Sequence, residues 1–160
     1  MRRFCMWLAL ILCMHGGFSS AAADSVRVPR KTPDREITMR VTGYCPCREC
    51  CNWKRNWLFR PVIASGPQKG RPKKVGITAS GKRAGPGTIA ADARLFPFGT
   101  IMYVPGYGYG IVEDRGGAIR GHHIDLFYRS HATAKKWGSK KLRVQVWYPP
   151  KTSRKPSRKK

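Results

Sequence analysis

Between residues 36 and 148 the chain alternates apolar and polar side chains over short stretches, and Gly or Pro separates one stretch from the next. Over residues 37–42, three apolar side chains alternate with three polar ones, which is typical of a half-buried β-strand. Many short strands must cover their unpaired edges, so the pattern predicts a mainly β, mostly antiparallel unit closed into a barrel. One short helix is expected over residues 132–137, capped by Ser130 and ended by Gly138. The expected strands are residues 37–42, 101–104, 109–112, 123–127 and 142–148.

The first 23 residues have the three parts of a secretory signal peptide. Arg2 and Arg3 give the positive start, an eleven-residue apolar run extends from Phe4 to Met14, and small residues precede the expected cleavage after Ala23. The run is too short to cross a hydrocarbon core of about 30 Å, which needs roughly 20 helical residues. The sequence therefore predicts a signal peptide at 1–23 and no transmembrane helix. The protein is expected in the periplasm, at the outer-membrane periphery or outside the cell.

The chain is strongly basic, with 32 Lys and Arg against 8 Asp and Glu, and its formal net charge is +24. This balance predicts a polyanionic partner. Export would separate the protein from nucleic acid, so we expect anionic polymers of the cell wall or outer membrane as partners instead. Residues 24–35 are interpreted as a basic linker. Residues 149–160 are interpreted as a disordered basic tail, which either attaches the protein to an anionic surface or only keeps it soluble.

Four cysteines lie within seven residues, directly after the first expected strand: Cys45, Cys47, Cys50 and Cys51. In an exported protein an even number of cysteines favours two disulfides, and sequence cannot rank the three possible pairings. Free thiols are the other favoured state. A metal such as zinc is the alternative, although zinc sites usually combine two CxxC pairs that are far apart in sequence. The prediction is therefore no metal and no cofactor. Three histidines are given no role: His122, His123 and His131.

Residues 36–148 hold only six acidic residues, and three of them are aspartates. One follows a run of small residues, one ends an expected strand at a glycine turn, and one lies within the expected strand 123–127. These are Asp92, Asp114 and Asp125. Cleavage of a glycosidic bond needs a proton donor, and an Asp that is protonated near neutral pH needs a pKa raised by burial or by a second carboxylate. Convergence of these aspartates would supply such a donor. The alternative is that they only cap turns.

Five segments carry a resemblance to a known family: residues 76–82, 87–92, 96–100, 104–108 and 113–125. In the last of these, Asp114 and Asp125 frame a Gly-Gly-Ala-Ile sequence at fixed spacing. The chain resembles the 3D (Asp-Asp-Asp) domain family over residues 36–148, and the three family aspartates match Asp92, Asp114 and Asp125. The resemblance implies a six-stranded double-psi β-barrel with one or two short helices, related to the catalytic domain of the membrane-bound lytic transglycosylase A group.

The resemblance also implies a role in peptidoglycan turnover. Asp125 would be the general acid and base that cleaves the bond between N-acetylmuramic acid and N-acetylglucosamine, leaving a 1,6-anhydro product, and Asp114 and Asp92 would raise its pKa. Substrate-binding residues would be Thr78, Ser80, Lys82, Gly116 and Gly117. A non-catalytic module that binds cell wall or carbohydrate is the alternative function, and an extracellular nucleic-acid binder is favoured by charge alone.

Residues 52–74 depart from the family pattern as a Trp-containing, basic insertion. Its Trp53 and Trp57 would either stack on sugar rings or pack over the barrel, and packing is slightly favoured. The insertion lies outside the three aspartates, so it bears on substrate preference rather than on the site itself.

Overall fold

The computed structural model describes residues 26–150. The signal peptide expected at 1–23 lies outside the described residues, as does the expected tail from residue 151 onward. Within residues 26–150, none of the helices combines the length and the apolar character needed to cross a membrane. The elements in chain order are β1 (Arg35–Tyr44), α1 (Arg48–Cys51), β2 (Trp53–Arg55), β3 (Pro61–Ile63), β4 (Thr88–Ala91), β5 (Ile101–Val104), β6 (Gly108–Asp114), β7 (His123–Phe127), α2 (His131–Trp137) and β8 (Lys140–Trp147).

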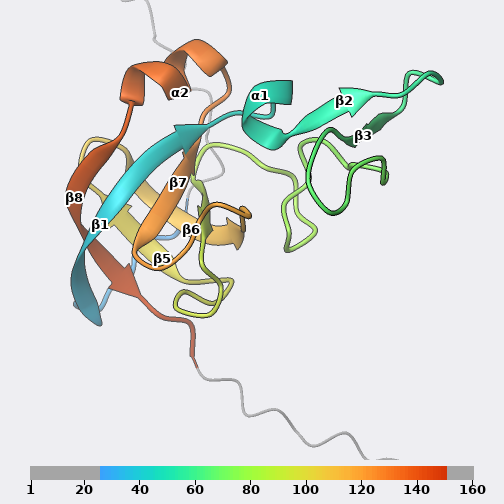
Figure 1. Ribbon diagram of the computed structural model, residues 1–160. Helices are drawn as coiled ribbons and strands as arrows, with labels where there is room; N and C mark the ends of the chain where they lie inside the picture. The colour runs from blue at the N-terminus through green and yellow to red at the C-terminus, as the bar shows by residue number, and fades with distance from the viewer. Residues whose placement is uncertain (1–25, 151–160) are drawn as a thin grey trace, which may run out of the picture.

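Six strands close into a barrel in the order β1-β7-β4-β6-β5-β8, and Figure 1 shows them wrapped around a common interior. β1 runs parallel to β7 and β4 runs parallel to β6, whereas the other four neighbouring pairs are antiparallel. Parallel neighbours need crossover connections, which an up-and-down barrel lacks. The predicted mainly β, six-stranded barrel is confirmed, and its two parallel pairs fit the double-psi arrangement.

The barrel strands pack one face into the interior. In β1 this face carries Met39 and Val41, and in β7 it carries Ile124 and Leu126, all of them at most 1% exposed. Full burial of one such side chain contributes about 1.5–3 kcal/mol, so these alternating positions fix the register of each strand. The core cluster consists of Met39, Val41, Ile89, Ala91, Phe96, Met102, Val104, Val112, Ile124, Leu126, Val144 and Val146.

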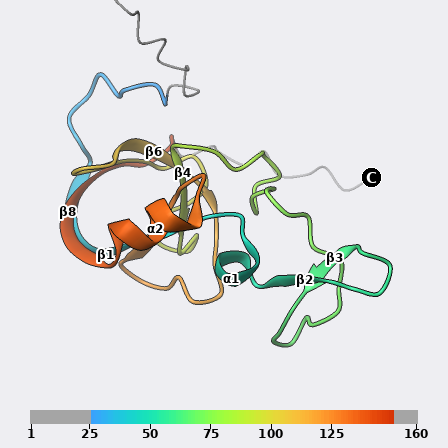
Figure 2. The same ribbon diagram turned by 90° about the horizontal axis from the view of Figure 1, so that it is seen from above.

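Helix α2 lies over one end of the barrel (Figure 2). Ser130 Oγ accepts a hydrogen bond from the first-turn backbone and Gly138 ends the helix, as the sequence predicts. Trp137 packs its ring against Tyr107 and Tyr128, with ring centroids 6.4 and 6.1 Å away. These contacts hold the helix onto the barrel.

The insertion at residues 52–74 contains the hairpin β2–β3, which projects from the barrel beside α1 (Figures 1 and 2). Trp53 donates its Nε1–H to the Pro46 carbonyl at 3.0 Å, and its ring faces the Arg48 guanidinium at 5.4 Å. Trp57 is 84% exposed. Trp53 therefore packs at the base of the hairpin, whereas Trp57 presents its ring to solvent.

Candidate active site

Strand register brings two of the three aspartates to either side of one small residue. Ala90 in β4 is the partner of Asp125 in β7 and of Asp114 in β6, while Thr42 in β1 is the partner of Asp125 across the parallel pair. Directly paired residues of neighbouring strands share a face of the sheet. Because Ile124 on β7 points inward, these polar side chains lie on the outer face, and the methyl group of Ala90 leaves space between them.

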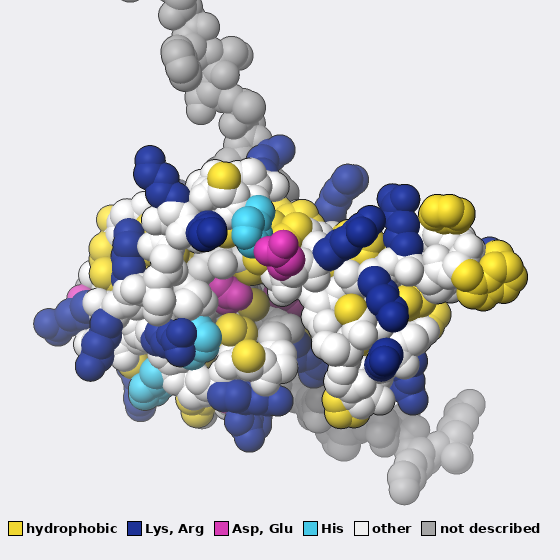
Figure 3. Space-filling view, turned by 45° about the horizontal axis from the view of Figure 1, so that its top comes forward, with side chains coloured by type: hydrophobic (Ala, Val, Ile, Leu, Met, Phe, Trp, Pro, Cys, Tyr) yellow, Lys and Arg dark blue, Asp and Glu magenta, His cyan; other side chains and the backbone are white. Residues whose placement is uncertain are grey.

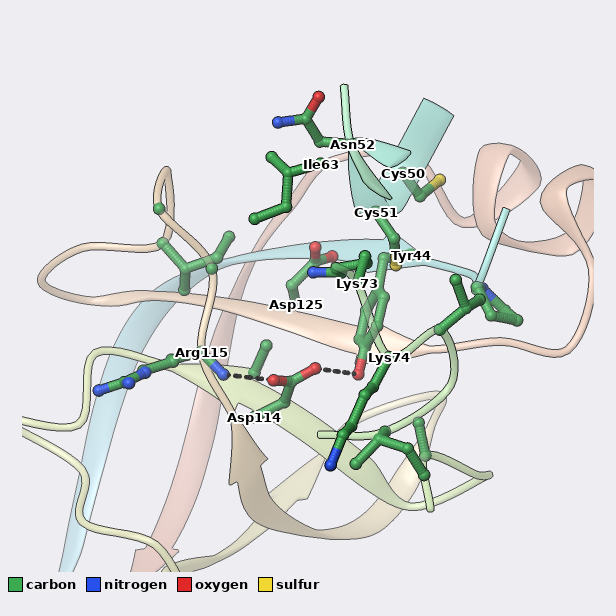
Figure 4. A pocket seen from close by; sticks show the side chains of 18 of the residues that line it. Tyr44, Cys50, Cys51, Asn52, Ile63, Lys73, Lys74, Asp114, Arg115 and Asp125 are labelled. Carbon is green, nitrogen blue, oxygen red and sulfur yellow. Dashed lines mark hydrogen bonds between the residues drawn. The ribbon is translucent and has the colours of Figure 1, made fainter. Parts of the chain in front are cut away.

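A cleft of about 680 Å³ opens over this face. In Figure 4 the Asp114 and Asp125 carboxyl groups lie near its centre. One wall comes from the insertion, which contributes Ile63, Lys73 and Lys74, among others. The space-filling view in Figure 3 shows acidic side chains near the middle of this face, with Lys and Arg side chains around them. Four cations line the cleft: Lys73, Lys74, Arg115 and Arg120.

The Asp125 carboxyl has the character of a proton donor. Burial raises its pKa to about 6 from the ordinary 3.8, and the negative charge of Asp114 adds to this effect. The Thr42 hydroxyl, which donates to Asp125 Oδ1 at 2.8 Å, acts in the opposite direction. The Asp125 carboxyl therefore exchanges its proton close to neutral pH, as a group that serves as both acid and base must do.

The Asp114 carboxylate is held by three donors. The Tyr44 hydroxyl donates to Oδ2 at 3.2 Å, and the backbone N–H groups of Ala79 and Arg115 donate to Oδ1 at 2.9 and 2.8 Å. Burial, followed by the charge of Asp114, raises the pKa of Tyr44 far above its usual range, so this hydroxyl stays protonated. Together the donors fix the position of a negative charge beside Asp125.

Asp92 lies apart from this pair and is not among the residues that line the cleft. It is 3% exposed, and its carboxylate accepts from the Arg94 guanidinium at 2.8 and 3.0 Å and from Gly121 N at 3.1 Å. The hydrogen bond from Arg94 is the largest influence, and with Gly121 it holds the pKa of Asp92 well below its usual range. Asp92 thus anchors one end of the β6–β7 loop.

The predicted groove residues between β3 and β4 build a turn. Thr78 is buried, and its Oγ1 lies 3.0 Å from Ser80 Oγ and accepts from Lys82 N at 3.1 Å. Ser80 N donates to the Glu113 carbonyl, and Lys82 Nζ forms an ion pair with Glu113 Oε1 at 2.6 Å. These contacts attach the turn to β6, which places Ala79 N on Asp114.

Gly116 and Gly117 both line the cleft, in the loop that Asp92 anchors. A Cβ at Gly116 would lie 2.8 Å from Cγ1 of Ile119, whereas a Cβ at Gly117 would meet nothing within 4 Å. Of these two glycines, only Gly116 is therefore needed for close packing within the loop.

Two residues that the sequence analysis left unassigned bind the aspartates directly, namely Thr42 and Tyr44. Thr42 lies on the polar face of the first expected strand, residues 37–42, and Tyr44 follows two residues later because β1 extends beyond that expected end. What sequence alone lacked was the strand partner. The four cysteines are free thiols in this structure, and Cys50 and Cys51 line the edge of the cleft.

Part of this site lies in a segment that is similar to known proteins. Residues 87–148 match the model of the 3D domain family. The putative cell wall shaping protein YabE of Bacillus subtilis is 40% identical over 58 residues, which cover 36% of this chain and 14% of that protein. The cell wall-binding protein YocH of B. subtilis is 41% identical over 75 residues, which cover 44% of this chain and 26% of that protein. The chain thus spans about a quarter or less of the length of these relatives.

Among solved structures, MltA from E. coli aligns with 49% of this chain and 30% of its own, at 22% identity and a TM-score of 0.39. MltA with bound chitohexaose aligns with 56% of this chain and 32% of its own, at a TM-score of 0.40. The family match covers all three aspartates. Asp92, Asp114 and Asp125 thus all lie within the segment, residues 87–148, that is similar to the 3D domain.

Proposed function

We propose that this protein is an exported enzyme that cleaves the glycan strands of peptidoglycan. The observation that carries the proposal is the Asp125 carboxyl, which is partly buried in a cleft with a pKa of about 6 and has a second carboxylate beside it. Two relatives of the 3D domain are named as cell wall proteins, which supports a wall polymer as substrate. The signal-peptide pattern at residues 1–23 supports export.

The reaction needs one group that first gives and then takes a proton. Protonated Asp125 would donate its proton to the oxygen between N-acetylmuramic acid and N-acetylglucosamine while the glycosidic bond breaks. The resulting Asp125 carboxylate would then accept the proton of the muramyl 6-hydroxyl as that oxygen attacks the anomeric carbon. The product is a 1,6-anhydro sugar, and Asp125 ends in its original protonation state.

Other residues at the site would stabilise the transition state and position the loop that lines the cleft. The fixed charge of Asp114 would stabilise the positive charge that develops on the sugar ring, and it also helps to keep Asp125 protonated. Asp92 would act as a positioning residue through its hydrogen bond to Gly121, because it anchors the loop that carries Gly116 and Gly117. These two glycines would let the backbone approach the sugar. Thr78, Ser80 and Lys82 would contribute indirectly, because they stabilise the turn whose backbone N–H group holds Asp114.

Cations at the cleft fit a carboxylate-bearing polymer. Lys73 and Lys74 come from the insertion and Arg115 and Arg120 from the β6–β7 loop, so they approach the aspartates from two sides. Peptidoglycan carries carboxylates on its peptides and muramyl groups, and lysine and arginine would attract them. The basic tail at 149–160 would add to this attraction at the wall.

The test is digestion of purified sacculi by the full chain without residues 1–23, with mass spectrometry of the released fragments. We expect anhydro-muropeptides from the wild-type protein and a loss of at least about 100-fold in Asp125→Asn, the range in which general acid–base catalysis contributes. Glu36→Gln is the matched control, because Glu36 pairs with Arg143 on the barrel surface. Fragments with reducing ends would show that the enzyme is a hydrolase and not a transglycosylase.

The second candidate is a non-catalytic module that binds the cell wall. The relative named as a cell wall-binding protein favours it, as do the cations around the cleft. Such a module would cosediment with sacculi and release no fragments, and Asp125→Asn would leave its binding unchanged. That result would overturn the enzymatic proposal.

A further inference from the structure

A second cluster of chemical groups lies next to the cleft and takes no part in the proposed reaction. It contains the thiols of Cys45, Cys47 and Cys50 and the imidazole of His131, and their Sγ and Nδ1 atoms all lie within 4.8 Å of one another. Cys45 Sγ and Cys50 Sγ are 3.8 Å apart. His131 Nδ1 lies 3.9 Å from Cys45 Sγ, 3.4 Å from Cys47 Sγ and 3.6 Å from Cys50 Sγ.

These separations match the edges of a zinc tetrahedron. Zinc binds sulfur at about 2.3 Å and imidazole nitrogen at about 2.0–2.1 Å. In a regular tetrahedron those bond lengths place two sulfurs about 3.8 Å apart and a sulfur and a nitrogen about 3.5 Å apart. The four separations given above are therefore within about 0.4 Å of those in a tetrahedral zinc site. Three thiolates and one imidazole form a common ligand set of structural zinc sites.

The local backbone structure and neighbouring side chains orient these four groups toward one another. Cys47 caps α1, and its Sγ accepts from Cys50 N at 3.4 Å, which fixes the Cys47–Cys50 spacing as one helical turn. His131 is the first residue of α2, which lies close to α1 above the barrel in Figure 1. Its other ring nitrogen, Nε2, lies 3.4 Å from Glu49 Oε2. A carboxylate behind the imidazole is the usual means of orienting a metal-binding histidine.

The fourth cysteine of the motif is directed elsewhere. Cys51 Sγ donates to the Cys45 carbonyl at 3.2 Å and lines the cleft. The cluster accordingly has three sulfur ligands and one nitrogen ligand, and four protein ligands leave no open position for a water or substrate. Chemistry at the ion is thus not implied.

We propose that Cys45, Cys47, Cys50 and His131 bind a structural Zn²⁺ ion. Binding would release the three thiol protons to solvent and form three Zn–S bonds and one Zn–N bond. The ion would clamp α1 to the start of α2. Because α1 leads directly into the β2–β3 hairpin, the clamp would hold the insertion wall of the cleft against the barrel.

The experiment measures metal content and coordination in the full chain, purified with reductant and loaded with Zn²⁺ or Co²⁺. We expect one zinc per chain by elemental analysis, and Co²⁺ spectra with strong visible bands and a thiolate charge-transfer band. Cys47→Ser and His131→Ala should weaken zinc binding by more than about 100-fold, and Glu49→Gln by about 10-fold. Cys51→Ser and His122→Ala are the matched controls and should keep full stoichiometry.

One further variant separates loss of metal from loss of fold. His131→Cys keeps four ligands, so it should retain one metal per chain with a Co²⁺ spectrum shifted toward four sulfurs. Four freely titrating thiols with no bound zinc would overturn the proposal. So would a disulfide among these cysteines after purification without reductant, found by mass spectrometry, or equal loss of zinc in Cys51→Ser and Cys47→Ser.

Discussion

Replacing Asp125 with Asn should stabilise the folded protein at neutral pH even though it removes the proposed proton donor. Burial and the charge of Asp114 raise the pKa of Asp125 from 3.8 to about 6 in the folded chain. A carboxyl group with a higher pKa when folded binds its proton more tightly in the folded state. The folded state is therefore penalised as the pH rises above 3.8, and the penalty is complete above pH 6. The amide of the variant carries no charge, and its carbonyl oxygen still accepts from Thr42.

The magnitude follows from the difference between the two pKa values. A change from 3.8 to about 6 corresponds to about 3 kcal/mol in the free energy of unfolding at pH 7, since one pKa unit equals about 1.4 kcal/mol. At pH 4 the same relation leaves about 0.6 kcal/mol, because the folded-state group is then almost fully protonated and the unfolded-state group is only partly ionised.

Urea unfolding of the wild-type protein and Asp125→Asn at pH 7 and pH 4 measures both values. We expect the variant to be more stable by about 3 kcal/mol at pH 7 and by about 0.6 kcal/mol at pH 4. A variant that is less stable at pH 7, or equally stabilised at both pH values, would refute the reasoning. The first outcome would mean that the carboxylate is stabilised by its surroundings, and the second that the gain is unrelated to charge.

Three further predictions follow from the same geometry. Asp92→Asn should have the opposite effect to Asp125→Asn, because a lowered pKa stabilises the fold above pH 3.8; its stability should fall at pH 7 and the loss should shrink in acid, in the same urea assay. Thr42→Val removes a hydrogen bond to the ionised form of Asp125, so the alkaline limb of the pH–rate profile should move up by about one pH unit; an unchanged or lower midpoint would contradict this. Gly116→Ala should cost about 1–3 kcal/mol in thermal unfolding because its Cβ would collide with a buried side chain, whereas Gly117→Ala should be nearly neutral; equal effects would show that the loop adapts.

Alternation in the sequence was sufficient to find five of the six barrel strands, and it failed at the sixth for a physical reason. β4 is buried at all four positions, so Thr88 to Ala91 shows no change between a polar and an apolar face. That strand is also the one between the two site aspartates, so their approach to each other could not be derived from periodicity. The resemblance to the 3D domain identified the aspartates, but only the register around Ala90 shows how two of them meet.

The sequence offered a metal only as the alternative state of the four cysteines, and it gave no sign of His131, because the groups of this cluster are dispersed along the chain. Cys47 and Cys50 are close in sequence, but His131 follows more than 80 residues later, and it meets them only because α2 folds back over the barrel. A short helix of four residues that contains two cysteines has no periodicity to detect. The three histidines looked alike in sequence, and only contact with the thiols distinguishes His131 from the others.

The position of β1 in the barrel has a consequence for how the protein assembles. This first strand is hydrogen-bonded to β7 on one side and to β8 on the other, so its edges are both satisfied only after the chain has been made as far as Trp147. Contacts between such distant segments form late and slowly in folding. A chain shortened before β8 would expose an open strand edge and leave Thr42 and Asp125 without a closed barrel behind them. The cleft thus depends on the last strand of the barrel for its support.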